Sequence, residues 1–390
     1  MVDLVENSSA IRAMFEEGKR LTLLHGAENV FDFSLGNPNV PAPQKVKEAI
    51  KEIVDTQDSV TLHGYSNNAG YEDVREVLAK SINARFDTNF AARNIIMTVG
   101  AAGGLNVILK VLLNPGDEVM VFAPYFGEYR HYVSNFQGVL VEVSPQTKDF
   151  QPKLDEFKEK ITNRTKAVIV NTPNNPTGVV YSEDTIKQLA AILEEKQTEF
   201  GTQICLISDE PYRELVYDGV EVPYLTNYYA NTVVGYSYSK SLSLPGERIG
   251  YLVIPEALTD SEQVIAAANV ANRILGFVNA PTLQQRLIAE CIEESTDISY
   301  YNRNRETLYT GLVKMGFSCV KPGGAFYLFV KSPIEDETIF CAKAKEYNIL
   351  MVAGSAFGCP GYVRIAYCVA YETILNSLPK FEELARALQV

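Results

Sequence analysis

Apolar and polar positions follow a regular order between about residues 90 and 255. Short runs rich in β-branched residues are separated by amphipathic stretches, such as 104–113 and 183–195, and by turn signals. This order is typical of strands joined by crossover helices over a largely parallel sheet. The pattern predicts seven strands, at 95–99, 118–122, 139–143, 167–170, 204–208, 233–236 and 250–254.

The pattern changes after about Pro255, where longer helical segments begin. A helix from about residue 9 to 24 is expected to pack on the unit that these later segments form. For that unit the spacing of apolar residues predicts helical stretches at 282–291 and 293–310 and strands at 326–330 and 362–367.

These patterns predict an α/β protein with a large domain and a smaller one. The large domain has a mostly parallel seven-stranded sheet between helices, and the smaller α+β domain is built from both chain ends. A length of 390 residues agrees with about two domains. The expected division is 1–39 for an N-terminal arm and part of the small domain, 40–280 for the large domain, and 281–390 for the small C-terminal domain.

The charge balance bears on the kind of partner. The chain has 35 Lys+Arg against 48 Asp+Glu, a net charge of -13, which repels a phosphate backbone, so we expect no nucleic-acid partner. No apolar run approaches the roughly 18 residues of a spanning helix. The N-terminal ten residues are acidic and polar, unlike a secretory signal, so we expect no membrane association and a cytoplasmic location.

The cysteines and histidines give no metal motif. The six cysteines lie far apart without a C-x-x-C pair, and His25, His63 and His131 are too dispersed for a sequence-local site. We therefore predict reduced thiols and no metal.

Polar residues directly follow four of the predicted strands, where ligands settle in open α/β sheets. Small residues that open a helix, a serine and an arginine together suit a phosphate, because they supply backbone N–H groups, a hydroxyl and a fixed cation. The segments concerned are Gly100-Ala101-Ala102-Gly103-Gly104, Asn171-Thr172-Pro173-Asn174-Asn175-Pro176-Thr177-Gly178, Asp209-Glu210-Pro211-Tyr212 and Ser237-Tyr238-Ser239-Lys240, with Arg248 shortly after the last.

A phosphate site beside an acid, a tyrosine and a lysine resembles the fold type I pyridoxal-phosphate enzymes, specifically the class I/II aminotransferases of the aspartate aminotransferase superfamily. Each motif alone is weak, but the ordered set is specific and covers nearly the whole chain. The motifs are Leu35-Gly36-Asn37-Pro38, Tyr65-Ser66-Asn67-Asn68-Ala69-Gly70-Tyr71, Asn174-Asn175-Pro176-Thr177-Gly178, Asp209-Glu210-Pro211-Tyr212, Ser237-Tyr238-Ser239-Lys240, Arg248 eight residues beyond the lysine, and Val363-Arg364-Ile365-Ala366.

The resemblance implies pyridoxal 5'-phosphate as cofactor, bound by the large domain, and three catalytic residues, Lys240, Asp209 and Tyr212. Lys240 is expected to hold the cofactor aldehyde as a Schiff base, which requires a lowered pKa, since a lysine of pKa about 10.4 is almost fully protonated at neutral pH. Asp209 is expected to pair with the pyridine nitrogen. Tyr212 and Asn175 are expected to hydrogen-bond the ring oxygen, and Tyr125 to stack on the ring face.

By the same resemblance, the backbone amides of Ala101 and Ala102, together with Ser237 and Arg248, hold the cofactor phosphate. Many members have a larger or polar residue in place of Ala102, so only backbone contacts are expected there. Tyr65 matches a tyrosine that such enzymes donate from the opposite subunit, which predicts a homodimer.

The substrate pocket is expected to contain Gly36, Asn175 and Arg364, with Arg364 binding the α-carboxylate in a bidentate manner. Arg273 lies near the segment where members that act on acidic substrates place a second arginine, but its spacing does not align cleanly. The aromatic content allows an aromatic or methionine pocket equally well, so the sequence leaves the preferred amino acid open.

The function that these expectations favour is transfer of an amino group between an L-amino acid and a 2-oxo acid by a ping-pong mechanism. The alternative is a carbon–sulfur β-lyase or another pyridoxal-phosphate elimination on the same scaffold. A regulator with an aminotransferase-like domain lacks support, because the segment before Leu35 is too short for a winged helix. A nicotinamide-binding module lacks its G-x-G-x-x-G motif after a strand.

Each residue also has a structural alternative. Lys240 could be a solvated loop lysine, Asp209 a helix cap, Asn175 a turn residue and Arg364 one half of an internal ion pair.

Overall fold

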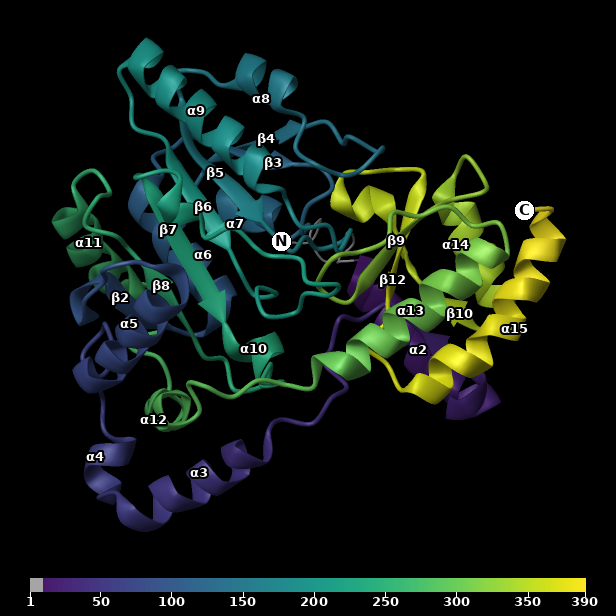
Figure 1. The fold of residues 1–390 in the computed structure, drawn as a ribbon, viewed down its shortest axis with the longest axis horizontal. Helices are drawn as coiled ribbons and strands as arrows, with labels where there is room; N and C mark the ends of the chain where they lie inside the picture. Colours follow the sequence, from purple (N-terminus) through teal and green to yellow (C-terminus); the bar gives the residue numbers. More distant parts are fainter. Residues whose placement is uncertain (1–9) are drawn as a thin grey trace.

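A seven-stranded sheet forms the centre of the larger part of the molecule in the computed structural model, which describes residues 10–390 (Figure 1). The strand order is β2-β8-β7-β6-β5-β3-β4, and β8 alone runs antiparallel to its neighbours. The predicted mostly parallel sheet is therefore confirmed. Its strands are β2 (Ile95–Thr98), β3 (Glu118–Phe122), β4 (Val139–Val143), β5 (Thr165–Asn171), β6 (Cys205–Asp209), β7 (Thr232–Ser237) and β8 (Gly250–Val253).

Helices cover both faces of this sheet, because alternate residues of each buried strand point to opposite sides. In β3, Val119 and Val121 pack with one cluster of apolar residues, and Met120 and Phe122 pack with another. The first face carries α6 (Gly100–Leu112), α7 (Tyr129–Ser134) and α11 (Ser261–Ile274). The opposite face carries α8 (Leu154–Lys160), α9 (Glu183–Phe200), α3 (Gln44–Thr56), α5 (Glu72–Phe86) and α12 (Thr282–Glu290).

A smaller α+β unit lies at the right of Figure 1 and contains segments from both ends of the chain. Its antiparallel sheet has the order β11-β12-β9, and a separate pair joins β1 to β10 in parallel. The two strands predicted here are present as β9 and β12, whereas the short β1, β10 and β11 were not predicted. The elements are β1 (Phe31–Asp32), β9 (Tyr327–Lys331), β10 (Ile349–Leu350), β11 (Val352–Ala353), β12 (Tyr362–Ala366), α2 (Ala10–His25), α13 (Ile298–Lys314), α14 (Glu337–Glu346) and α15 (Tyr371–Leu388).

The predicted N-terminal helix corresponds to α2, apart from residue 9, which lies outside the described residues. Helix α2 contacts β11, as expected for a helix that packs on the smaller unit. The helix expected at 282–291 in the smaller unit packs instead, as α12, against α3 and α5 of the larger unit. The domain boundaries at 39/40 and 280/281 stay predictions. Of the described residues, no helix is both long and apolar enough to cross a membrane.

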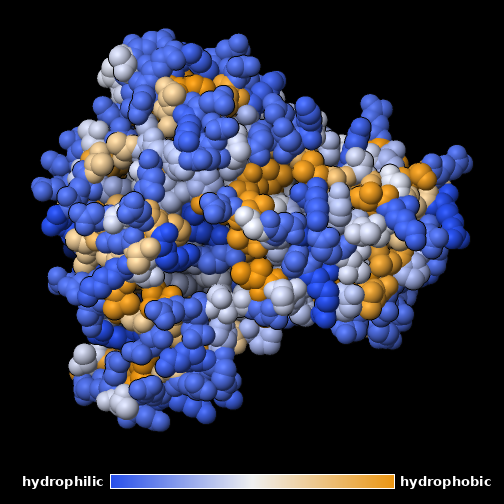
Figure 2. Space-filling model, in the orientation of Figure 1, coloured by the Kyte–Doolittle hydropathy of each residue, from blue (hydrophilic) through white to orange (hydrophobic). Residues whose placement is uncertain are grey.

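The chain that follows β6 connects the two units. The backbone N–H of Ala325 donates to Leu215 O at 2.8 Å, and the N–H of Tyr217 donates to Gly323 O at 3.0 Å. The buried Tyr217 hydroxyl donates to Ala325 O at 2.5 Å. Figure 2 shows apolar side chains gathered along the junction on this face. These contacts fix the start of β9 next to the residues that follow β6.

Candidate active site

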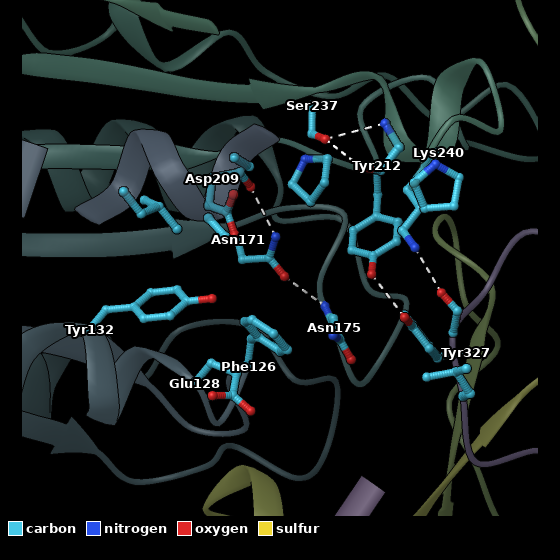
Figure 3. A pocket seen from close by; sticks show the side chains of 18 of the residues that line it. Phe126, Glu128, Tyr132, Asn171, Asn175, Asp209, Tyr212, Ser237, Lys240 and Tyr327 are labelled. Carbon is cyan, nitrogen blue, oxygen red and sulfur yellow. Dashed lines mark hydrogen bonds between the residues drawn. The ribbon is translucent and has the colours of Figure 1, made fainter. Parts of the chain in front are cut away.

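A cavity of about 370 Å³ lies where β5, β6 and β7 end, α6 begins and the smaller unit approaches (Figure 3). This volume lies within the range of small-molecule sites, roughly 300–1,000 Å³. The structure brings ten of the twelve predicted site residues to its lining: Gly36, Ala101, Ala102, Asn175, Asp209, Tyr212, Ser237, Lys240, Arg248 and Arg364. The other two, Tyr65 and Tyr125, do not line it.

Lys240 projects into the cavity from α10 (Tyr238–Ser241), whose first turn is capped by the Ser237 side chain. Its Nζ donates a hydrogen bond to Gly36 O at 2.7 Å. Burial, together with the positive charges of Arg364 and Arg248, lowers the pKa of the Lys240 amine to about 8, although Cys368 opposes the change. A group with that pKa is neutral in about a tenth of molecules at pH 7, so it can act as a nucleophile.

Asp209 is the last residue of β6 and is buried. Its Oδ2 accepts a hydrogen bond from the Tyr129 hydroxyl at 2.5 Å, whereas its buried Oδ1 has no partner in the described part of the chain. Burial raises the pKa of the Asp209 carboxyl to about 7, although the bond from Tyr129 opposes the rise, and the nearby Glu210 carboxylate adds to it. An unsatisfied buried oxygen at a cavity indicates a missing donor or cation.

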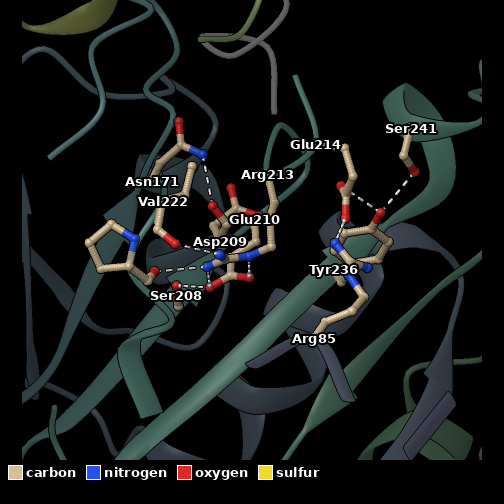
Figure 4. Close-up of polar contacts among 11 residues, drawn as sticks. Arg85, Asn171, Ser208, Asp209, Glu210, Arg213, Glu214, Val222, Tyr236 and Ser241 are labelled. Carbon is tan, nitrogen blue, oxygen red and sulfur yellow. Dashed lines mark hydrogen bonds and ion pairs between the residues drawn. The ribbon is translucent and has the colours of Figure 1, made fainter. Parts of the chain in front are cut away.

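The next residue, Glu210, has a different role because its carboxylate is fully paired (Figure 4). Arg213 Nη2 donates to Glu210 Oε1 at 2.6 Å, and the Ser208 hydroxyl donates to the same oxygen at 2.7 Å. Arg213 Nη1 also donates to Val222 O at 3.0 Å. Glu210 therefore holds the loop after β6 in place, which leaves Asp209 as the acid available to a ligand.

A second network fixes the helix that carries Lys240 (Figure 4). The Tyr236 hydroxyl lies 2.8 Å from Glu214 Oε2 and 2.8 Å from Ser241 Oγ. Glu214 also accepts from Arg85 at 2.6 Å. Ser241 follows Lys240 directly, so the network restrains α10 from the side away from the cavity.

The start of α6 and Arg248 form one end of the cavity. Arg248 donates to Pro245 O at 3.0 Å and to Val99 O at 3.4 Å. Gly100 has φ +76°, and a Cβ at this position would lie 3.0 Å from Arg248 Nη2. Glycine thus allows the guanidinium to approach the helix N-terminus, with the Ser237 hydroxyl lining the same cavity. A cation, a hydroxyl and free helix amides fit an anion such as phosphate.

Arg364 lies on β12 and is almost completely buried. Its Nη1 donates to Asn175 Oδ1 at 3.0 Å and its Nη2 to Ser34 O at 2.6 Å, but its Nε has no partner among residues 10–390. No carboxylate within that range forms an ion pair with it, so the alternative of an internal ion pair is not supported. A buried guanidinium with an unused N–H fits an anionic ligand.

Tyr125, which we predicted to stack on the face of the cofactor ring, is absent from the cavity lining. Its hydroxyl hydrogen-bonds Glu142 at 2.9 Å and accepts from Arg130, both away from the lining residues. The neighbouring Phe126 lines the cavity instead. Tyr65, the other predicted residue outside the lining, is 90% exposed. Arg273, whose role the sequence left open, is exposed on α11 and also lies outside the lining.

Further lining residues were missed by the sequence analysis. Asn171 ties two loops together, because its Nδ2 donates to Asp209 O at 2.9 Å and its Oδ1 accepts from the Asn175 N–H at 2.8 Å. Its place at the end of β5 was a signal that could have identified it. No comparable signal marked Phe126, Glu128, Tyr132 or Tyr327 as lining residues, or Tyr129 as the partner of Asp209.

The fold and the cavity define an α/β enzyme built around a reactive lysine at strand ends. The family model for aminotransferase class I and II matches residues 28–378. The aspartate aminotransferase of Thermotoga maritima is 29% identical, over 95% of this chain and 96% of that protein. A probable aspartate/prephenate aminotransferase of Aquifex aeolicus is 31% identical, over 91% of each chain.

Solved structures agree with these relatives. An aminotransferase from Eubacterium rectale has 49% sequence identity and a TM-score of 0.96, over 98% of this chain and 96% of that one. The Thermus thermophilus aspartate aminotransferase with maleate has 29% identity and a TM-score of 0.86, over 96% of each chain. The chain belongs to the class I and II aminotransferase family, and it is an aminotransferase that uses pyridoxal 5'-phosphate.

The buried Asp209 carboxyl predicts how stability depends on pH before the cofactor binds. Because its folded pKa, about 7, exceeds its unfolded value of 3.8, stability falls as pH rises between these values. Asp209→Asn removes this loss, so the cofactor-free variant should be more stable than wild type above pH 7, by on the order of 4 kcal/mol, and equal to it below pH 4.

Urea unfolding of both cofactor-free proteins across this pH range measures the difference. If the free energy of unfolding of the two proteins depended on pH in the same way, the raised pKa of Asp209 would be contradicted.

Proposed function

We propose that this aminotransferase works by a ping-pong mechanism through a Schiff base on Lys240. Three groups around one cavity support this proposal: the Lys240 amine with its lowered pKa, the unpartnered Asp209 Oδ1 and the unpartnered Arg364 Nε. The decisive observation is the unpartnered Asp209 oxygen, because a buried carboxylate requires a cation that no described residue supplies. A protonated pyridine nitrogen has the required charge.

When bound, pyridoxal 5'-phosphate supplies an aldehyde for the amino group and a ring that accepts electrons from the substrate. The amides of Ala101 and Ala102, the Ser237 hydroxyl and Arg248 would hold its phosphate. This assignment rests on the anion-binding end of the cavity, where Gly100 lets Arg248 approach the start of α6.

Asp209 would keep the ring nitrogen protonated, with Tyr129 orienting its other oxygen. Tyr212 and Asn175 would hydrogen-bond the ring oxygen, since both line the cavity near Lys240. Phe126, which lines the cavity, would take the ring-face position that we had predicted for Tyr125.

Arg364 would bind the substrate α-carboxylate beside Gly36 and Asn175. The amine of Lys240, once displaced by the substrate, would remove the α-proton and return it to the cofactor carbon. With the cofactor bound, the same residues would serve both the release of one 2-oxo acid and the binding of a second, since each oxo acid has a carboxylate for Arg364. The two half-reactions account for ping-pong kinetics.

The elimination reaction of a carbon–sulfur β-lyase would use the same Lys240, Asp209 and Arg364. Release of pyruvate and ammonia from cysteine or cystathionine without an oxo-acid acceptor would favour that alternative.

We also propose a homodimer in which Tyr65 acts in the site of the partner subunit. Tyr65 is 90% exposed and lies just after α4 (Ser59–His63), where Val60 is 82% exposed. In Figure 1, α3 and α4 project from the larger unit. Exposed apolar residues on such an arm support contact with another copy of the chain. The cytoplasmic location stays a prediction from the sequence.

Lys240→Ala should lower steady-state turnover by at least about 10³-fold, because it removes both the attachment point and the proton-transfer group. The test is turnover with a panel of amino acids and 2-oxoglutarate. Lys187→Ala, which removes an exposed lysine of α9, is the matched control and should retain normal turnover. Normal turnover of Lys240→Ala would refute the mechanism.

Tyr65→Phe should weaken cofactor binding about 10- to 100-fold, the usual effect of losing one hydrogen bond to a charged group. Equilibrium titration of the cofactor-free protein measures the dissociation constant, and sedimentation measures the oligomeric state. Tyr228→Phe, which removes a hydroxyl that donates to Glu183 at the surface, is the control. A monomer at micromolar concentration, or unchanged affinity in Tyr65→Phe, would contradict the proposal.

A further inference from the structure

Two tyrosine hydroxyls meet between the units at the edge of the cavity. The hydroxyl oxygens of Tyr212, which follows β6, and Tyr327, in β9, lie 2.8 Å apart (Figure 3). The residues are 5% and 2% exposed, and both line the cavity. Within residues 10–390, neither hydroxyl makes another hydrogen bond. Each therefore depends on the other or on a bound ligand.

The position of the Tyr327 hydroxyl is tightly restricted. A Cβ at Gly36 would lie 2.0 Å from it, so only glycine leaves room for this hydroxyl. The Arg364 guanidinium lies 4.6 Å from the centre of the Tyr327 ring, and the Tyr212 ring packs edge-on at 5.7 Å. The hydroxyl is thus directed at Tyr212 by the packing around it.

The number of protons decides the direction of this hydrogen bond once the cofactor is bound. A phenol hydroxyl has one proton and can accept up to two hydrogen bonds. If Tyr212 donates its proton to the ring oxygen of the cofactor, as the proposed function requires, it has none left for Tyr327. The bond at 2.8 Å must then run from the Tyr327 hydroxyl to the Tyr212 oxygen.

We propose that Tyr327 is a positioning residue that donates to Tyr212 and so directs the Tyr212 proton at the cofactor ring oxygen. This inference rests on the proposed function. Hydrogen bonds in a chain strengthen one another, so a donor behind Tyr212 makes Tyr212 a stronger donor. No sequence motif marks Tyr327 for this role, because its partner Tyr212 lies 115 positions away along the chain.

The predicted consequence is a change in the pH dependence of the visible absorbance of the loaded enzyme. When the Schiff-base nitrogen loses its proton, the ring oxygen loses one hydrogen-bond donor, so the hydrogen bond from Tyr212 contributes more to its stabilisation. A stronger hydrogen bond from Tyr212 therefore favours the deprotonated Schiff base and lowers its apparent pKa. The other charged or titratable groups that the described residues place at or beside the cavity are the same in all variants: Asp209, Arg248, Arg364, Glu128, Tyr129, Tyr132 and Cys368.

The test is spectroscopic titration of the holoenzyme in four forms: wild type, Tyr327→Phe, Tyr212→Phe and the double variant. Tyr327→Phe should raise the apparent pKa by roughly half a unit. In the Tyr212→Phe background, the same change should have no further effect, because the two hydroxyls act as one chain. Tyr229→Phe is the control: it removes a buried hydroxyl that donates to Ile204 O and does not line the cavity, so it should leave the titration unchanged.

A second substitution covers the case in which Tyr327→Phe does not fold. Replacement of Tyr327 with 3-fluorotyrosine keeps the hydroxyl and makes it a stronger donor, so the apparent pKa should fall. Any of three results would overturn the role of Tyr327. They are an unchanged apparent pKa in Tyr327→Phe, an equal pKa shift when the same change is made in the Tyr212→Phe background, and an unchanged pKa with 3-fluorotyrosine. If the wild type itself lacks a pH-dependent visible band, the proposed function fails first, and this inference fails with it.

Discussion

The fold buries ionisable groups at the cavity without pairing them with an opposite charge, and the site depends on this constraint. Asp209 and Arg364 each keep one polar atom without a hydrogen-bond partner in the described residues. Among the same residues, the Lys240 amine has the Gly36 carbonyl oxygen as its one hydrogen-bond acceptor. Burial of unpaired polar groups is costly, and at a cavity a bound ligand can offset that cost. The unpaired groups lower the stability of the cofactor-free protein. The cofactor and substrate remove this cost when they bind, and that gain contributes to their binding free energy.

The surrounding structure ensures that these groups stay unpaired. Glu210, next to Asp209, is fully paired by Arg213 and Ser208, so it does not compete for the ligand. Asn175 holds Arg364 through a neutral amide, which orients the guanidinium and leaves its charge in place. Neighbouring residues thus have different roles: Glu210 holds its loop in place, whereas Asp209 beside it faces the cavity.

Much of this arrangement could be predicted from the sequence, because parallel strands are short apolar runs and ligands bind where such runs end. Asp209 and Ser237 end strands as expected, and Lys240 follows within one turn. The direction of a side chain within an irregular loop has no periodic signal, so Tyr125 was chosen where Phe126 lines the cavity. The pair Tyr212 and Tyr327 required tertiary structure, and two-residue strands such as β1 are too short to show a period.

Lys240 is the proposed attachment point of the cofactor. Borohydride reduction of the loaded enzyme, followed by digestion and mass spectrometry of the peptides, locates that attachment directly. We expect one modified peptide, with the cofactor on Lys240. Attachment to another lysine, or no attachment at all, would contradict it.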